Sequence, residues 1–361
     1  MALEPSPQHA KLDDFVWKPW FKKLQEYLNS TSSGNKNQQM TFNRVMNGSM
    51  AMWQSGASLT LAAATGHSHC DGWSYSAGAG FAGYQIVRAV TPPTGLVYGI
   101  RYIRTAAGTN TGQQMLIHDM ESVDSRPLAG KTVVCSFWAR VGANWSPTTG
   151  LTASLETGTG TDAARRSGAY AGADVTSMNV TPNTGYARFS FTKRLATTAT
   201  QLCVYFSFTP VGTAGANDWV DITGVQIEIG DEPSDFLHDD RQRALERCQR
   251  RYYKSFHQDD VPVQNFGTTA GAYFWTAVTA GATAQRGLVY PLPTTMRVTP
   301  TITTFNPLAA NAEARDATGA ADCTGTTAAA NDNAVWFLTT GAAGTAVGNR
   351  LAVHFVADAR I

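Results

Sequence analysis

Charged residues are scarce in this sequence. Asp, Glu, Lys and Arg make up 15% of the 361 residues, whereas about 25% is usual in soluble domains. The 28 basic and 27 acidic residues almost cancel, leaving a net charge of +1. A chain without a broad positive field does not attract nucleic acid or an anionic membrane surface. We therefore expect no nucleic-acid partner.

Long apolar runs are missing as well. No stretch reaches the roughly 18 apolar residues that a membrane-spanning helix requires. The first residues also lack the basic and apolar segments of a secretory leader. These absences predict a chain that does not insert into a membrane and that is assembled in the cytoplasm of the cell that produces it.

Paired cysteines and clustered metal ligands are absent too. The five cysteines are widely scattered and include no CxxC pair, so neither a structural zinc site nor a disulfide framework is indicated. The segment from His67 to Asp71 does place two histidines, a cysteine and an aspartate within five residues, and such side chains bind transition metals. Because no second group of ligands stands nearby in the sequence, we expect no metal and no cofactor.

Motifs of catalysis are missing from the sequence. There is no Gly-x-Ser-x-Gly nucleophile motif and no Gly-x-x-x-x-Gly-Lys phosphate loop. Glycan cleavage requires two positioned carboxylates, and the acidic residues between Asp119 and Glu228 form no telling group along the chain. The sequence therefore predicts a protein that binds and does not catalyse.

Short strands separated by turns dominate residues 40–238. Apolar runs with alternation occur at 132–140, 187–192 and 202–208, and clusters of Gly, Pro, Asn and Thr separate them; this pattern is typical of β-strands. No helical spacing lies between these runs, which favours two stacked antiparallel sheets. We predict an all-β fold whose first domain is a jelly-roll β-sandwich.

A second, smaller β domain is expected over residues 257–361, with strands at 271–278, 297–305, 334–338 and 351–356. This region contains only five basic and seven acidic residues. A surface with so few charges suggests that other copies of the chain cover part of it.

The amino-terminal segment has helical spacing. Residues 1–39 are predicted to form a short amphipathic helix followed by a polar linker. A helix this short is not stable alone, so its apolar face needs a partner. We predict that this segment attaches the protein to a larger assembly through Trp17, Trp20, Phe21, Leu24 and Leu28.

A second helix is predicted between the two β domains, over residues 239–256. Asp239 and Asp240 suit its amino-terminal end, and arginines occupy its polar faces. These arginines either bind an anionic group or, the preferred interpretation, link neighbouring subunits. We predict that its apolar face packs against another copy of the chain through Leu245, Cys248, Tyr252 and Phe256.

Five aromatic residues lie near glycine-rich turns, where the loops of a sandwich expose side chains. Exposed rings can stack on the faces of sugars, whereas core packing is the commoner use of such residues. The candidates for glycan contact are Trp73, Tyr75, Tyr84, Trp145 and Tyr170.

Five segments together resemble one family, the tail-fibre and head-fibre (spike) proteins of bacteriophages. The family's Asn-Arg-hydrophobic-hydrophobic-Asn-Gly-Asp-Met start is similar to Asn43-Arg-Val-Met-Asn-Gly-Ser-Met50. Its Ser-Phe-Trp strand is similar to Val133-Val-Cys-Ser-Phe-Trp-Ala-Arg140, and its Thr-Gly-Val-Gln-Leu-Glu strand to Ile222-Thr-Gly-Val-Gln-Ile-Glu-Ile-Gly230. Its Cys-Gln-Arg-Tyr-Tyr helix is similar to Leu245-Glu-Arg-Cys-Gln-Arg-Arg-Tyr-Tyr-Lys254, and its Met-Arg-x-x-Pro-Thr motif to Pro291-Leu-Pro-Thr-Thr-Met-Arg-Val-Thr-Pro-Thr-Ile302.

The resemblance covers the chain from Asn43 to its end. One element departs from the family: Gly72 stands in Asp71-Gly-Trp73 where the family has Arg. The resemblance implies a carbohydrate-binding-like jelly roll, a connecting helix and a β tip domain, in a subunit at the surface of the virion. It implies contact with a glycan or receptor of the host cell. Together with the apolar face of the second helix and the low charge of the second β domain, it predicts a homotrimer. Other virion proteins are expected to bind the amino-terminal segment, which lies outside the resemblance. The alternative is a tailspike enzyme that degrades glycan.

Overall fold

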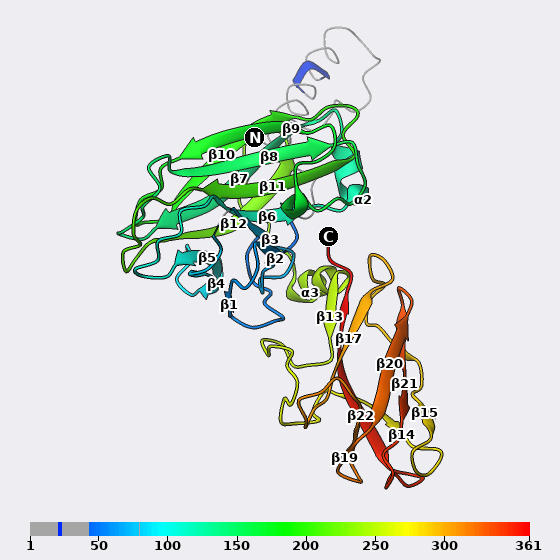
Figure 1. The fold of residues 1–361 in the computed structure, drawn as a ribbon. Helices are drawn as coiled ribbons and strands as arrows, with labels where there is room; N and C mark the ends of the chain where they lie inside the picture. Colours follow the sequence, from blue (N-terminus) through cyan, green and yellow to red (C-terminus); the bar gives the residue numbers. More distant parts are fainter. Residues whose placement is uncertain (1–20, 24–42, 79) are drawn as a thin grey trace, which may run out of the picture.

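The computed structural model describes residues 21–23 and 43–361 with the exception of residue 79. This part of the chain is built almost entirely of antiparallel strands, arranged as a large sandwich followed by a smaller β domain (Figure 1). The predicted all-β fold class is therefore confirmed. Of the amino-terminal helix, residues 21–23 are helical and Phe21 is about half exposed, whereas the predicted attachment residues Trp17, Trp20, Leu24 and Leu28 lie outside the described residues.

The sandwich consists of two six-stranded sheets whose neighbouring strands are antiparallel. The first sheet has the order β1 (Ser58–Thr60), β4 (Tyr84–Ala89), β5 (Gly99–Arg104), β12 (Trp219–Ile229), β7 (Thr132–Val141) and β10 (Ala187–Arg194). The second has the order β2 (Thr65–His67), β3 (Ser74–Ala77), β6 (Gln114–Asp119), β11 (Gln201–Phe208), β8 (Leu151–Gly158) and β9 (Asp174–Val180). The chain repeatedly crosses between the sheets, as expected of a jelly roll.

Alternation along the strands builds the sandwich core. On β7, Cys135 and Phe137 point inward, whereas Trp138 and Arg140 point outward and remain partly exposed. The rings of Phe137 and Phe206, from opposite sheets, have their centroids 4.8 Å apart with an interplanar angle of 69°. Burying apolar side chains from both sheets stabilises their stacking. Three short helical turns lie between the strands: α2 (Ser122–Ser125), η1 (Arg126–Leu128) and η2 (Arg165–Ser167).

The connection to the second domain contains a short helix, α3 (Arg241–Gln249), and then strand β13 (Tyr252–Lys254). The side chain of Asp240 caps α3 by accepting from the backbone N–H groups of Gln242 and Arg243. The predicted helix over 239–256 is thus too long, because β13 pairs with the last strand of the chain. Tyr252 and Phe256 consequently do not belong to the helix.

The apolar face of α3 is covered within the chain. Cys248 is 1% exposed, and it packs with Ala244, Met46 and Met52. The prediction of a subunit interface is wrong for Cys248, Tyr252 and Phe256, since these side chains are buried in the single chain. For Leu245, which is half-buried, it stays a prediction. The segment 43–52, which follows the polar linker, supplies the cover that the sequence argument assigned to another copy.

The C-terminal domain contains two sheets. In the first, the central strand β22 (Arg350–Asp358) pairs with β13, β14 (Tyr273–Thr276), β17 (Thr301–Phe305) and β18 (Arg315–Asp316), and β18 also pairs with β19 (Ala321–Asp322). The second consists of β15 (Ala284–Arg286), β16 (Tyr290–Pro291), β20 (Thr324–Ala330) and β21 (Ala334–Thr340). Between the sheets lies a separate core that includes Trp275, Phe337 and Phe355.

Ion pairs and hydrogen bonds join the two domains. Glu121 of the sandwich accepts from Arg250 at 3.0 Å and from Arg251 at 3.2 Å, and Asp162 accepts from Arg297 at 3.0 Å. The carboxy-terminal residue returns to this junction (Figure 1), where its carbonyl accepts from Arg166. Glu121 and Arg251 are both buried, so removing either partner would leave an uncompensated buried charge. This pair therefore stabilises the junction.

Candidate functional site

Four of the five predicted glycan-contact rings belong to the core. Trp73 is 1% exposed, and Tyr75, Tyr84 and Tyr170 are 5% exposed or less. Tyr75 and Tyr84 lie on strands β3 and β4, so they do not belong to exposed loops. The ring of Trp73 lies 5.3 Å from that of His118 and 6.2 Å from that of Phe206. A buried ring has no face for a sugar, and the prediction is wrong for these four.

Tyr170 shows why the glycine-rich turns misled the prediction. The loop between β8 and β9 lies over the outer face of the second sheet, where Tyr170 packs with Met115, Ile117, Cys203 and Tyr205. The hydroxyl of Tyr170 donates to the carboxylate of Asp119. The fifth residue, Trp145, is half-buried, and its ring lies 4.9 Å from that of Phe208. Glycan contact by Trp145 stays a prediction.

The segment from His67 to Asp71 is distributed between two environments. His67 and His69 face Asp358 and Arg360 of the C-terminal domain around a cavity of about 300 Å³. Burial, followed by the charges of Arg360 and Arg166, lowers the pKa of His67 to about 3. Cys70 lies in the sandwich core, fully buried. In the part of the chain that the structure describes, no three His, Cys, Asp or Glu side chains group around a metal position.

Three buried carboxylates of the sandwich accept hydrogen bonds from arginine side chains. Asp221 is fully buried between Arg101 at 2.6 Å and Arg140 at 2.9 Å. Asp218 pairs with Arg104, and Glu156 pairs with Arg165 at 2.6 Å. These acids compensate buried cations, and in this arrangement they act in packing.

None of the described helices is long and apolar enough to cross a membrane.

Strand β21 of the C-terminal domain presents large apolar side chains to solvent. Along this strand, Val335 and Phe337 are buried, whereas Trp336 and Leu338 are 39% and 38% exposed. The ring of Phe337 lies 5.3 Å from that of Phe355 in the domain core. Since successive side chains of a strand point to opposite faces, anchoring Phe337 in the core turns Trp336 and Leu338 outward.

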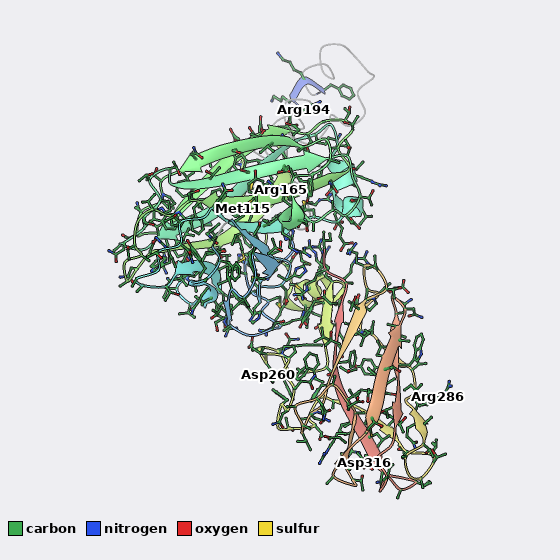
Figure 2. The ribbon with its side chains drawn as sticks, viewed as in Figure 1. Met115, Arg165, Arg194, Asp260, Arg286 and Asp316 are labelled. Atoms are coloured by element: carbon green, nitrogen blue, oxygen red, sulfur yellow. The ribbon has the colours of Figure 1, made fainter. Side chains whose placement is uncertain are left out.

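The neighbouring strands bound a shallow groove around these two side chains. Leu338 is paired with Thr327 on β20 and with Arg286 on β15, and Trp336 is paired with Ala329 on β20. The groove encloses about 460 Å³, and Arg286 lies on the outer side of the domain (Figure 2). It is lined by Arg286, Gly287, Val289, Thr327, Ala328, Ala329, Trp336, Phe337 and Leu338.

The composition of the groove determines what it can bind. Thr327 and Ala329, which are exposed on the same face of β20, have small side chains and leave room beside the indole of Trp336. Ligand sites are commonly apolar surfaces with a few placed polar groups, and here Arg286 and Thr327 provide hydrogen-bond donors. The groove therefore suits a flat ligand with one apolar face and polar edges.

The sequence did not identify this groove. The strand over 334–338 was expected, but Ala-Val-Trp-Phe-Leu is apolar throughout. Alternation that could distinguish an inner from an outer face is absent, and an exposed Trp cannot be told from a buried Phe beside it. The one available signal was the small-residue run Thr-Thr-Ala-Ala-Ala that ends at Ala330.

Comparisons with known proteins give only partial structural likenesses. No family model matches the chain, and no curated protein matches it. Among solved structures, the enzymatically active domain of tailspike protein 4 of bacteriophage CBA120 is 13% identical, with a TM-score of 0.34 over 52% of this chain and 22% of that one. The chain thus spans about a fifth of the length of that structure.

Two carbohydrate-binding structures show a similar degree of likeness. TmCBM61, solved in complex with beta-1,4-galactotriose, is 12% identical, with a TM-score of 0.29 over 52% of this chain and 99% of that one. A CBM4 structure is 13% identical, with a TM-score of 0.26 over 44% of this chain and 87% of that one. At these TM-scores the likenesses carry no argument about ligand or activity.

Proposed function

We propose that this chain is a structural subunit of a bacteriophage particle that binds a glycan of the host cell surface without cleaving it. The observation that carries the binding part is the exposed indole of Trp336 in a groove of about 460 Å³. The virion part rests on the five sequence segments, from Asn43 to Ile302, that resemble phage fibre proteins.

The groove matches the two surfaces of a sugar ring. A pyranose has a face of C–H groups and an edge of hydroxyl groups, so it requires an aromatic face with hydrogen-bonding groups beside it. Trp336 supplies the face, and Arg286 and Thr327 supply the polar groups. An aromatic contact of this kind contributes about 1 kcal/mol beyond the area it buries, which favours weak binding that several copies reinforce.

Binding without cleavage is supported by the residues that line the Trp336 groove. Hydrolysis of a glycosidic bond requires one carboxylate that holds a proton and a second that acts on the sugar. The residues that line the Trp336 groove include no acid. A glycan-degrading tailspike enzyme is the alternative, and release of oligosaccharide from host polysaccharide by the purified chain would replace the present proposal.

The proposal includes two assembly contacts. The amino-terminal segment, with Trp17, Trp20, Phe21, Leu24 and Leu28, attaches the chain to other virion proteins, so that the protein is located at the particle surface. Three copies form a homotrimer, which the low charge of residues 257–361 supports. The exposed apolar side chains of Val289 and Leu338 favour a second candidate role for the Trp336 groove, as a contact surface between copies of the chain.

One set of variants separates glycan binding from contact between copies. Trp336→Ala, Leu338→Ala and, as a matched exposed apolar control, Val347→Ala are compared for binding to host cells and for mass by light scattering. Val347 is 66% exposed and lies outside the groove. We expect Trp336→Ala to reduce cell binding about five-fold or more at unchanged mass.

The other outcomes assign the groove differently. If Trp336→Ala and Leu338→Ala both lower the mass while Val347→Ala does not, the groove is a contact between copies. If all three variants bind cells as the parent chain does, with unchanged mass, the groove is not the receptor site, and the proposal is wrong in that part.

A further inference from the structure

A second cavity lies at the junction between the sandwich and α3. It encloses about 340 Å³, a size that accommodates a small saccharide. Three parts of the chain form it: the segment after residue 43, the end of β6 with α2, and α3 with the two residues that follow. Its lining residues are Arg44, Met46, His118, Met120, Glu121, Val123, Asp124, Arg243, Arg247, Arg250 and Arg251.

Positive charge dominates this cavity. Five arginines and two acids, Glu121 and Asp124, line it, so the lining has a net charge of +3. Asp239 stands outside the lining and accepts from Arg247 at 2.6 Å. The whole chain has a net charge of only +1. The cavity is therefore a local concentration of cations on a nearly neutral molecule.

Three of the five guanidinium groups are held by hydrogen bonds within the fold. Arg251 is 6% exposed, and it donates to Glu121 at 3.2 Å and to the carbonyl of Asp119 at 2.9 Å. Arg250 donates to the same carboxylate through Nε and Nη2. Arg247 donates to the carbonyl of Asn43 at 3.1 Å. Preorganised guanidinium groups bind an oxyanion at a lower entropic cost than flexible ones.

The histidine of the cavity adds no charge of its own. The Nε2 atom of His118 accepts from the backbone N–H of Met46 at 3.2 Å, and its Nδ1 lies 2.8 Å from the carbonyl of Gly72. Burial, and then the charge of Arg251, lower the pKa of His118 to about 3. His118 therefore lines the cavity as an uncharged side chain, and the positive charge that helps to lower its pKa belongs to the arginines.

We propose that this cavity binds a saccharide through an oxyanion that it bears, a phosphate or a carboxylate. Guanidinium groups form paired, charge-assisted hydrogen bonds with both kinds of oxyanion. Met46, Met120 and Val123 offer apolar surface to the remainder of the ligand. The inference does not depend on the Trp336 groove, because that groove lies on the other domain and shares no lining residue with the cavity.

The test titrates the full chain with four probes by calorimetry: glucose 6-phosphate, glucuronate, inorganic phosphate and, as the neutral match, glucose. We expect glucose 6-phosphate or glucuronate to bind, with an affinity that falls as salt is added, and glucose not to bind. No binding of either anionic sugar would overturn the proposal. Inorganic phosphate bound as tightly as the sugar phosphate would overturn the assignment to a saccharide.

Two variants and a matched control locate the site. Arg243 is exposed and lines the cavity, so Arg243→Ala removes one charge there, and we expect affinity to fall about ten-fold. Arg241 is exposed on the same helix but does not line the cavity, so Arg241→Ala removes an equal charge and should change affinity less than about two-fold. Asp124→Asn removes a lining acid and should strengthen binding.

The Arg241→Ala control distinguishes binding of the anion in the cavity from general electrostatic attraction to α3. If Arg241→Ala weakens binding as much as Arg243→Ala does, the anion responds to the general charge of α3, and the cavity is not its site. An Asp124→Asn variant that binds no more tightly than the parent chain would likewise contradict the placement of the anion beside that residue.

Discussion

The ionisation of Asp71 can be used to test whether water reaches its buried carboxyl group. Asp71 is 7% exposed, and its Oδ2 accepts from the backbone N–H of Gln54 at 3.3 Å. Burial raises the pKa of Asp71 from 3.8 to about 7, although the hydrogen bonds from Gln54 and the charges of Arg360 and Lys254 oppose the shift. An ionised Asp71 therefore destabilises the folded chain, and a protonated one does not.

The size and sign of the effect follow from the shift. A difference of roughly 3 pKa units corresponds to roughly 4 kcal/mol, at 1.36 kcal/mol for each unit. Above about pH 7, Asp71 is ionised in both the folded and the unfolded chain, and this cost is fully present. Between about pH 7 and pH 4 the folded chain binds the proton first, so the cost disappears as the pH falls.

The perturbation is Asp71→Asn, which keeps the shape and removes the charge. At about pH 8 we expect the free energy of unfolding to rise by about 1–3 kcal/mol, less than the full 4 because the new amide N–H groups need acceptors. Near pH 4.5 the gain should shrink toward zero or reverse. Urea unfolding followed by tryptophan fluorescence measures both values.

The control for this experiment is Asp235→Asn, which removes a charge from an exposed side chain. It should change the free energy of unfolding by less than about 0.5 kcal/mol at either pH. If Asp71→Asn changes stability equally at both values of pH, Asp71 ionises as it does in water. In that case water reaches the carboxyl group of Asp71 in the folded chain, and the reasoning about its burial is refuted.

Two further predictions concern the core and the amino-terminal segment. Trp73→Ala should lower the free energy of unfolding by roughly 3–5 kcal/mol, because its ring packs in the sandwich core. Trp145→Ala should lower it by less, and denaturant unfolding compares the two variants. An equal or smaller loss of stability for Trp73→Ala would contradict the placement of Trp73 in the core. A chain that begins at Gly34 should unfold at the same temperature as the parent chain but fail to join particles. Its amount in purified virions measures this. Incorporation at the parent level would show that residues 1–29 do not attach the chain to the particle.

The sequence by itself determined the fold class and the positions of several strands. The predicted strands over 202–208 and 351–356 correspond to β11 (Gln201–Phe208) and β22 (Arg350–Asp358). Period-two alternation and turn residues are local properties, so a window of a few residues contains them. The cap of α3 was local in the same way, since Asp240 lies beside the amide groups that it caps.

The end of α3 and the burial of the rings were decided by partners far along the chain. Tyr252 becomes part of a strand because it pairs with Asp358, and no helical spacing reveals that pairing. Tyr170 is buried because its loop folds over β6 and β11. A glycine-rich turn indicates where the chain bends, but the surface onto which it folds depends on segments that are distant in sequence.

Both candidate binding surfaces depend on the tertiary structure. Trp336 faces solvent because Phe337 packs into the core with Phe355, a choice that an all-apolar strand leaves open. The arginines in and directly after α3 were visible in the sequence, but Glu121, the partner of Arg250 and Arg251, lies 129 residues before Arg250. Strand and helix propensities act over a few residues, whereas cavities and charge clusters form where distant segments meet, and only the packed chain brings those segments together.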